Sequence, residues 1–149
     1  MRRRTLQTLL AASGAAAMLA LTPVAADAAP FSGGNYGAYG FEGQYPTVGG
    51  CTGSFRQVGP TKTASGMSLK YFYSVRCGSY ARIDNSRNNC AAVIERSNSG
   101  AGNADGWVSE TVDPGINYAY TKIGNNLSGR VSRALLTCDG HVLAYTNWY

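Results

Sequence analysis

The chain has 149 residues, and its 13 Lys and Arg against 8 Asp and Glu give a formal net charge of +5. After the first four positions the basic residues are scattered, without a cluster of five or six. This balance excludes the basic patch typical of nucleic-acid-binding proteins. One histidine cannot complete a Cys/His zinc site, and the cysteines have no CxxC spacing, so we expect no metal and no cofactor.

Residues 1–28 have the pattern of a secretory signal peptide. Arg2–Arg4 form its basic start, and an apolar stretch follows, roughly from Leu9 to Leu21. This stretch is shorter than the about 20 apolar residues that a membrane-spanning helix needs. Small residues before Ala29 fit a signal-peptidase site, so we expect cleavage after Ala28 or one residue later. The mature protein is then expected to be secreted, without a membrane segment, and its net charge falls to +3 because 10 basic and 7 acidic residues remain.

Residues 29–50 differ from the rest of the mature chain. Positions 31–50 hold seven glycines and five aromatic residues, and glycine at this density disfavours regular structure. We expect a flexible arm, which either spaces the domain, packs back onto it, or docks into a groove or sheet edge of a partner protein. In the docking interpretation its aromatic residues are the partner-binding residues, namely Phe31, Tyr36, Tyr39, Phe41 and Tyr45.

All four cysteines lie in the expected domain, residues 51–149. In an oxidising compartment an even count predicts two disulfide bonds, with three pairings possible. Each bond is expected to stabilise the fold by roughly 2–4 kcal/mol. The cysteines are Cys51, Cys77, Cys90 and Cys138.

Short alternating runs separated by turn residues follow Cys51. Met67–Arg76 places Met67, Leu69 and Tyr71 on one face, which is typical of a strand, and Asp139-Gly140 predicts a type I′ hairpin. We predict an all-β fold, a small disulfide-stapled β-barrel or sandwich with a flexible Gly/aromatic N-terminal arm. The expected strands are Ser54–Val58, Met67–Arg76, Ser79–Ile83, Ala91–Arg96, Trp107–Thr111, Tyr118–Ile123, Val131–Thr137 and Val142–Trp148.

Candidate catalytic residues are few. His141 directly follows the Asp139-Gly140 turn, where we expect an exposed ring that Asp139 orients poorly. Glu95 and Glu110 would suit a glycosidase only if a cleft held them about 5–10 Å apart, and charges at strand edges are the commoner use. We therefore predict no catalytic residues.

Aromatic side chains offer another chemistry, because they stack on sugars or bases. Alternation turns half of them toward the core, so core packing is the first interpretation. The candidates are Tyr71, Phe72, Tyr73, Tyr118, Tyr120, Tyr145, Trp148 and Tyr149.

Three pieces of the sequence carry a resemblance: Gly50-Cys51, Leu69–Ile83 (LKYFYSVRCGSYARI), and the stretch from Val131 to Tyr149 that closes with Thr-Asn-Trp-Tyr. Together they resemble a group of small exported actinobacterial proteins with an uncharacterised β-domain. Typical of that group are a strand pair with Leu-Arg-Tyr-Ser, Cys and Trp-Ala-Arg, and a closing Thr-x-Trp; Tyr80 stands where Trp is frequent. The resemblance implies a small barrel or sandwich with Cys51–Cys77 and Cys90–Cys138 bonds, and nothing about activity.

In export, size, disulfides and the arm Phe31–Gly50, the chain is also similar to the adaptor subunit of umbrella-shaped antibacterial toxin particles. That resemblance implies an arm that docks into another secreted protein. The leading hypothesis is therefore a secreted, non-enzymatic protein-binding module, an adaptor whose partners are other secreted proteins. The alternatives are a small hydrolase or enzyme inhibitor acting at the cell envelope, and a structural envelope protein.

Overall fold

The computed structural model describes residues 39–100 and 102–149. The expected signal peptide, and Phe31 and Tyr36 of the expected arm, lie outside these residues. Within the described ranges no helix is long and apolar enough to cross a membrane.

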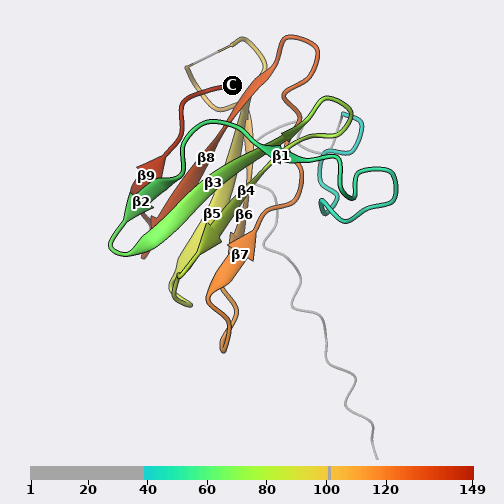
Figure 1. Cartoon of the computed structure of the whole chain (residues 1–149). Coiled ribbons are helices and arrows are strands. Elements are labelled where there is room, and N and C mark those ends of the chain that lie inside the picture. The colour runs from blue at the N-terminus through green and yellow to red at the C-terminus, as the bar shows by residue number, and fades with distance from the viewer. Residues whose placement is uncertain (1–38, 101) are drawn as a thin grey trace, which may run out of the picture.

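The described residues form nine strands in two antiparallel sheets that pack face to face as a sandwich (Figure 1). The first sheet has the order β1-β3-β4-β7, with β2 also paired to β3, and the second has the order β6-β5-β8-β9. The all-β prediction is confirmed, and of its two forms the fold is the sandwich, since neither sheet closes into a barrel. The strands are β1 (Arg56–Gln57), β2 (Lys62–Ala64), β3 (Met67–Ser74), β4 (Gly78–Asp84), β5 (Cys90–Ser97), β6 (Gly106–Thr111), β7 (Tyr118–Tyr120), β8 (Val131–Cys138) and β9 (His141–Tyr145).

Alternating side chains explain the main core. In β3 the residues Met67, Leu69 and Tyr71 are buried while those between them are half-buried, as period-two alternation predicts. The second sheet contributes Ile94 of β5 and Leu136 of β8, which are fully buried. Burying side chains of this size stabilises the fold by about 1.5–3 kcal/mol each.

The hairpin between β8 and β9 has the predicted two-residue turn. Asp139 and Gly140 have φ values of 51° and 78°, so both adopt the positive φ of a type I′ turn. β2 was not predicted; it is three residues long and lies in a polar stretch, so its alternation is too short to be recognised.

Two disulfides are formed, with the pairing that the resemblance implies. Cys90–Cys138 joins directly opposed residues of β5 and β8 at the edge of the main core. Cys51–Cys77 forms a second small core with Ile123, against which Phe41 packs. Two disulfides are consistent with an extracellular protein.

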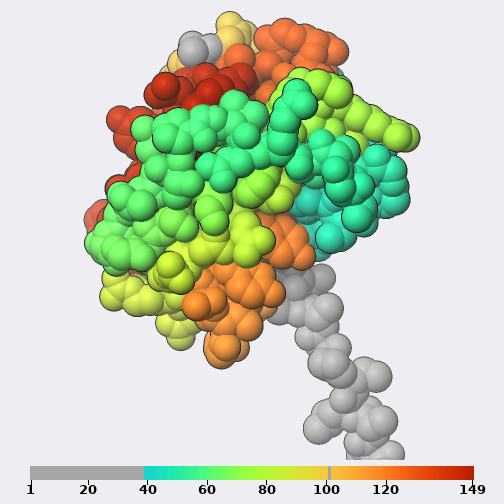
Figure 2. Space-filling model, in the orientation of Figure 1, coloured from blue at the N-terminus to red at the C-terminus, as the bar shows by residue number. Residues whose placement is uncertain are grey.

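Residues 39–50, the described part of the expected arm, are packed onto the domain, which is one of the three interpretations of the arm. Gly43 donates a backbone hydrogen bond to Ile123 at 2.9 Å, and Ile123 donates one to Gln44 at 2.8 Å. The Glu42 carboxylate accepts from Arg96 Nε at 2.7 Å, and both side chains are fully buried. In Figure 2 the first described residues cover one end of the molecule, beside the end of β3 and the chain that follows β7. A buried ion pair and a hydrophobic contact thus hold this glycine-rich segment in place.

Candidate functional site

The outer face of the first sheet carries a row of aromatic rings. In β4, Ala81 and Ile83 are fully buried toward the core, so Tyr80 and Arg82 face outward. The strand register places Phe72 of β3 opposite Tyr80 and Tyr120 of β7 opposite Arg82. This one sheet face therefore presents rings from three neighbouring strands.

These rings contact one another. The Phe72 and Tyr80 rings are stacked, with centroids 4.8 Å apart and planes within 5°. Phe55, which precedes β1, meets Tyr80 edge-on at 4.9 Å, and Tyr120 meets it edge-on at 6.4 Å. Because each ring is supported by a neighbour, the surface is preorganised, which reduces the entropy lost on binding.

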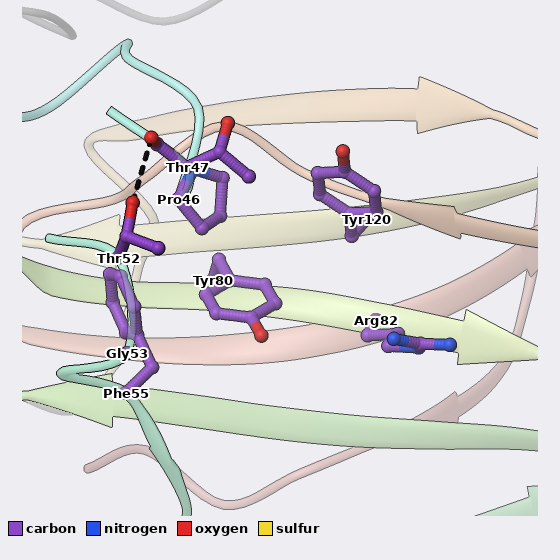
Figure 3. Close-up of a pocket in the computed structure, with 8 residues that line it drawn as sticks. All are labelled: Pro46, Thr47, Thr52, Gly53, Phe55, Tyr80, Arg82 and Tyr120. Atoms are coloured by element: carbon purple, nitrogen blue, oxygen red, sulfur yellow. Dashed lines mark hydrogen bonds between the residues drawn. The ribbon is translucent and has the colours of Figure 1, made fainter. Parts of the chain in front are cut away.

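A groove of about 340 Å³ lies over three of these rings, Phe55, Tyr80 and Tyr120, and we call it the aromatic groove. Figure 3 shows Tyr80 at its centre, Arg82 further along the same strand, and Pro46 and Thr47 from the packed N-terminal segment. The Thr52 hydroxyl donates to the Thr47 carbonyl at 2.8 Å, and this hydrogen bond joins two residues that line one side of the groove. The lining residues are Pro46, Thr47, Thr52, Gly53, Phe55, Tyr80, Arg82 and Tyr120.

A second, smaller pocket of about 240 Å³ shares Tyr120 with the aromatic groove, and we call it the tyrosine pocket. Tyr45 stands between the two, with its ring edge-on to Tyr120 at 6.2 Å and its hydroxyl donating to Glu110 Oε1 at 3.1 Å. The lining residues are Tyr45, Glu110, Thr111, Asp113, Ile116, Tyr118, Ala119 and Tyr120.

The pKa values of two carboxyl groups near the pockets, Glu110 and Asp84, are shifted in opposite directions. Burial, together with the charge of Asp113, raises the pKa of Glu110, although Tyr45 and Lys122 act to lower it. Burial also acts to raise the pKa of Asp84, but hydrogen bonds from Lys70 and Arg82 outweigh it and lower that pKa below its ordinary value.

The Asp84 carboxylate accepts from Lys70 Nζ at 2.9 Å and from Arg82 Nε at 2.8 Å. These contacts anchor Arg82 at the end of the aromatic groove with 41% of its side chain exposed. Its guanidinium also lies 5.4 Å from the centre of the Tyr118 ring. The groove therefore ends in a fixed positive charge.

The residues considered for catalysis lie apart from one another. His141 is exposed at the start of β9, and Asp139 accepts a hydrogen bond from Asn89 instead of orienting its ring. Glu95 accepts from Arg133 Nε at 2.6 Å and lines an apolar pocket with Trp107 on the outer face of the second sheet. Glu110 lines the tyrosine pocket, so the structure does not join Glu95 and Glu110 in one cleft.

The described members of the predicted docking set make contacts within this chain. The Tyr39 ring lies 3.8 Å from the guanidinium carbon of Arg130 and 5.3 Å from that of Arg96. Phe41 packs on the Cys51–Cys77 core, while Tyr45 remains 42% exposed beside the tyrosine pocket. Of these three, Tyr45 is the one that lines a pocket.

No group of three or more His, Cys, Asp or Glu side chains in the described ranges is placed to hold a metal ion.

Comparisons of the chain with protein-family models, with curated proteins and with solved structures found no match.

Sequence reasoning found part of this site. The sequence predicts Phe72, Tyr118 and Tyr120 as stacking candidates, but not Tyr80 or Phe55. The signal for Tyr80 was present, since it occupies an outward position in a predicted strand. Phe55 also lies in a predicted strand, Ser54–Val58, but β1 begins at Arg56, and the chain before it brings the Phe55 ring onto Tyr80.

Proposed function

We propose that this protein is a secreted, non-enzymatic protein-binding module whose aromatic groove holds an extended segment of another secreted protein. The observation that carries the proposal is the set of rings around Tyr80 on one open sheet face, where Tyr80 contacts Phe55, Phe72 and Tyr120. Tyrosine combines a large apolar body with a polar tip, which suits it to protein interfaces.

The shape and chemistry of the groove favour an extended peptide. Grooves lined by aromatic rings dock extended, proline-containing segments, whose stiff backbone loses little entropy on binding. Thr47 and Thr52 supply polar groups beside the rings, and Arg82 supplies a positive charge at one end. A segment with an acidic residue next to an apolar, extended stretch fits this arrangement best.

Secretion is part of the proposal and is supported by the signal-peptide pattern and the two disulfides. An adaptor role in an extracellular assembly is the form that the resemblance suggests. In that role the packed residues 39–50 supply a wall of the groove, and docking by the arm itself rests on the earlier residues Phe31 and Tyr36.

The test is capture from culture supernatant of the native organism with tagged mature protein as bait. Tyr80→Ala and Tyr120→Ala remove two rings of the groove, and a bait that begins at Tyr39 removes the preceding arm. Tyr145→Ala is the matched control, because Tyr145 is 59% exposed and belongs to β9 of the second sheet. Circular dichroism and thermal melting confirm that each bait is folded.

A partner captured by wild type and Tyr145→Ala, but lost with the groove variants, supports the proposal. Capture that survives the groove variants and is lost on truncation moves the docking site to the arm. Failure of every bait to capture a stoichiometric partner contradicts the binding-module proposal.

A second candidate, a small secreted glycoside hydrolase, is favoured by one observation. Glu110 has a raised pKa and shares the tyrosine pocket with Asp113, an arrangement in which one carboxyl acts as acid and the other as base. Incubation with cell-wall glycan and chromogenic glycosides tests this. Turnover that Glu110→Gln abolishes, with the fold intact, would favour the hydrolase over the binding module.

A further inference from the structure

The tyrosine pocket lies where the two sheets meet at one side of the sandwich. β6 is the edge strand of the second sheet and β7 the edge strand of the first, and the pocket is lined by residues of both and of the turn between them. Its volume of about 240 Å³ is below the range typical of pockets for small-molecule ligands, which begins near 300 Å³. A single side chain is the size of ligand that suits it.

Two acidic side chains line this pocket, and neither is part of a salt bridge among the described residues. Glu110 accepts a hydrogen bond from Tyr45, and Asp113 lies close enough to raise the pKa of Glu110 by its charge. Other carboxylates of the domain are paired differently: Glu42, Asp84 and Glu95 each accept from an arginine at 2.6–2.8 Å.

Burial is the largest cause of the raised pKa of Glu110. The charge of Lys122 acts to lower this pKa, but it does not outweigh burial, so the charged form of Glu110 stays less favourable than in water. A cation entering the pocket would reverse this effect, because an opposite charge within about 4–6 Å favours the ionised carboxylate.

The tyrosines add a second, independent preference for positive charge. Tyr45, Tyr118 and Tyr120 all line the pocket, and the face of an aromatic ring attracts cations. Two of these rings already hold a cation of this chain: Arg82 lies 5.4 Å from the Tyr118 centroid and Lys122 lies 5.4 Å from that of Tyr45. Rings and carboxylates therefore favour the same kind of ligand.

We propose that the tyrosine pocket binds a basic side chain, lysine or arginine, of a protein partner. The ammonium or guanidinium group contacts Glu110 and Asp113, and the alkyl stem lies along the tyrosine rings. The preference for an organic cation rests on the pocket alone, whereas its origin in a partner protein rests on the proposed function. Arg82 lines the aromatic groove, whereas Glu110 and Asp113 line the tyrosine pocket, so the two adjoining pockets present charged side chains of opposite sign to a bound segment.

The experiment is a titration of 15N-labelled mature protein, followed by amide chemical shifts. The probe is Nα-acetyl-lysine N-methylamide, and its Nε-acetylated form is the neutral control. Nα-acetyl-arginine N-methylamide, choline and Ca²⁺ distinguish a basic side chain from a quaternary amine and a metal ion. We expect shifts around Glu110, Tyr118 and Tyr120 with the lysine and arginine probes, and at least tenfold weaker binding of the neutral control.

Glu110→Gln and Asp113→Asn keep the shape of the side chain and remove its charge, and each is expected to weaken binding of the lysine probe about tenfold. Glu95→Gln is the matched control, since Glu95 lines the pocket on the other sheet, and it is expected to bind as wild type does. Unchanged amide spectra elsewhere show that each variant is folded.

Equal binding of the neutral control, equal loss with Glu95→Gln, or shifts with choline or Ca²⁺ alone would overturn the assignment. Probe binding does not depend on finding a partner. If the lysine probe binds and no partner is captured, the protein-binding function is contradicted and the cation site is supported. If a partner is captured and the lysine probe does not bind, the cation site is contradicted and the protein-binding function is supported.

Discussion

The domain has two hydrophobic cores of different origin. The main core lies between the two sheets and is built from alternating strand residues such as Leu69 and Leu136. The second core is small and consists of Cys51, Cys77 and Ile123, with Phe41 packed against it from the glycine-rich segment. The main core gives the sandwich its shape, whereas the second core fixes the segment that walls the aromatic groove. Both regions are therefore expected to contribute to stability, but binding is expected to depend mainly on the second core.

The buried ion pair that joins these regions gives the largest expected effect. Glu42→Gln removes the charged carboxylate that accepts from the fully buried Arg96, and we expect the free energy of unfolding to fall by about 3–5 kcal/mol. Urea unfolding of the purified variant measures this loss.

The control is the ion pair between Glu95 and Arg133, whose side chains are 17% and 28% exposed. Glu95→Gln is expected to cost clearly less than Glu42→Gln, because solvent reaches both side chains of this part-buried pair. Replacing both buried partners, Glu42→Gln with Arg96→Met, should recover part of the loss, because no isolated charge remains. Equal losses for Glu42→Gln and Glu95→Gln would show that residues 39–50 are not held by this pair.

Removing the two disulfides one at a time separates the two regions further. The Cys90–Cys138 bond closes the longer loop, with a sequence separation of 48 against 26 for Cys51–Cys77. Loop entropy predicts losses of roughly 4 and 3.5 kcal/mol for the corresponding double alanine variants. The two losses are similar in size but should have different local consequences, because the Cys51–Cys77 bond supports the segment that walls the aromatic groove.

Limited proteolysis measures that difference. The variant without Cys51–Cys77 should be cleaved within residues 39–55 while the sandwich stays intact, and it should lose partner capture. The variant without Cys90–Cys138 should instead be cleaved after global unfolding. Identical cleavage patterns for the two variants would contradict the independence of the second core.

The same division explains how much the sequence could predict. Strands such as β3 and β8, and the Asp139-Gly140 hairpin, follow from local alternation and turn chemistry, which a single sequence displays. The packing of residues 39–50 depends on contacts with Arg96 and Ile123, more than 50 residues away, and glycine density alone favours disorder. The aromatic groove has the same origin, since Phe55 and Tyr80 meet only after the chain folds.

Gly78, at the start of β4, lies at the junction between the two cores. Its substitution tests that junction, and the expected loss of stability is smaller than for the ion pair or the disulfides. Its φ of 106° is unfavourable for other residues, and a Cβ atom there would collide with the carbonyl oxygen of Gly124. Because Ser79 and Gly124 exchange backbone hydrogen bonds at 2.8 and 2.7 Å, this contact has little freedom to shift. We expect Gly78→Ala to cost about 1–3 kcal/mol in urea unfolding.

Gly49→Ala is the matched control, because no atom lies within 4 Å of a Cβ built there. It is expected to change stability by less than about 0.5 kcal/mol. A Gly78→Ala variant as stable as wild type would mean that the junction between β4 and residue 124 is looser than the structure shows.

The smallest effect is the pH dependence of two carboxylates beside the pockets, which should have opposite signs. The lowered pKa of Asp84 adds stability above its ordinary value of 3.8, and this is lost as the pH falls through the lowered pKa. The raised pKa of Glu110 gives stability that is fully present below its ordinary value of 4.5 and lost as the pH rises through the raised pKa. Each carboxyl group is expected to change the free energy of unfolding by less than about 1 kcal/mol, because solvent screens the charges of Asp84 and Glu110.

Urea unfolding between pH 3 and pH 7 tests these signs with two isosteric variants. At neutral pH Asp84→Asn should be less stable than wild type, and Glu110→Gln equally or slightly more stable, with the two differences shrinking toward low pH. A lysine probe saturating the tyrosine pocket should remove the advantage of Glu110→Gln, since the bound cation stabilises the ionised carboxylate of the wild type and not the amide. A Glu110→Gln variant that loses stability at neutral pH would show that the carboxylate already has a sufficient countercharge within the chain, and the pocket would then have no need of a cation.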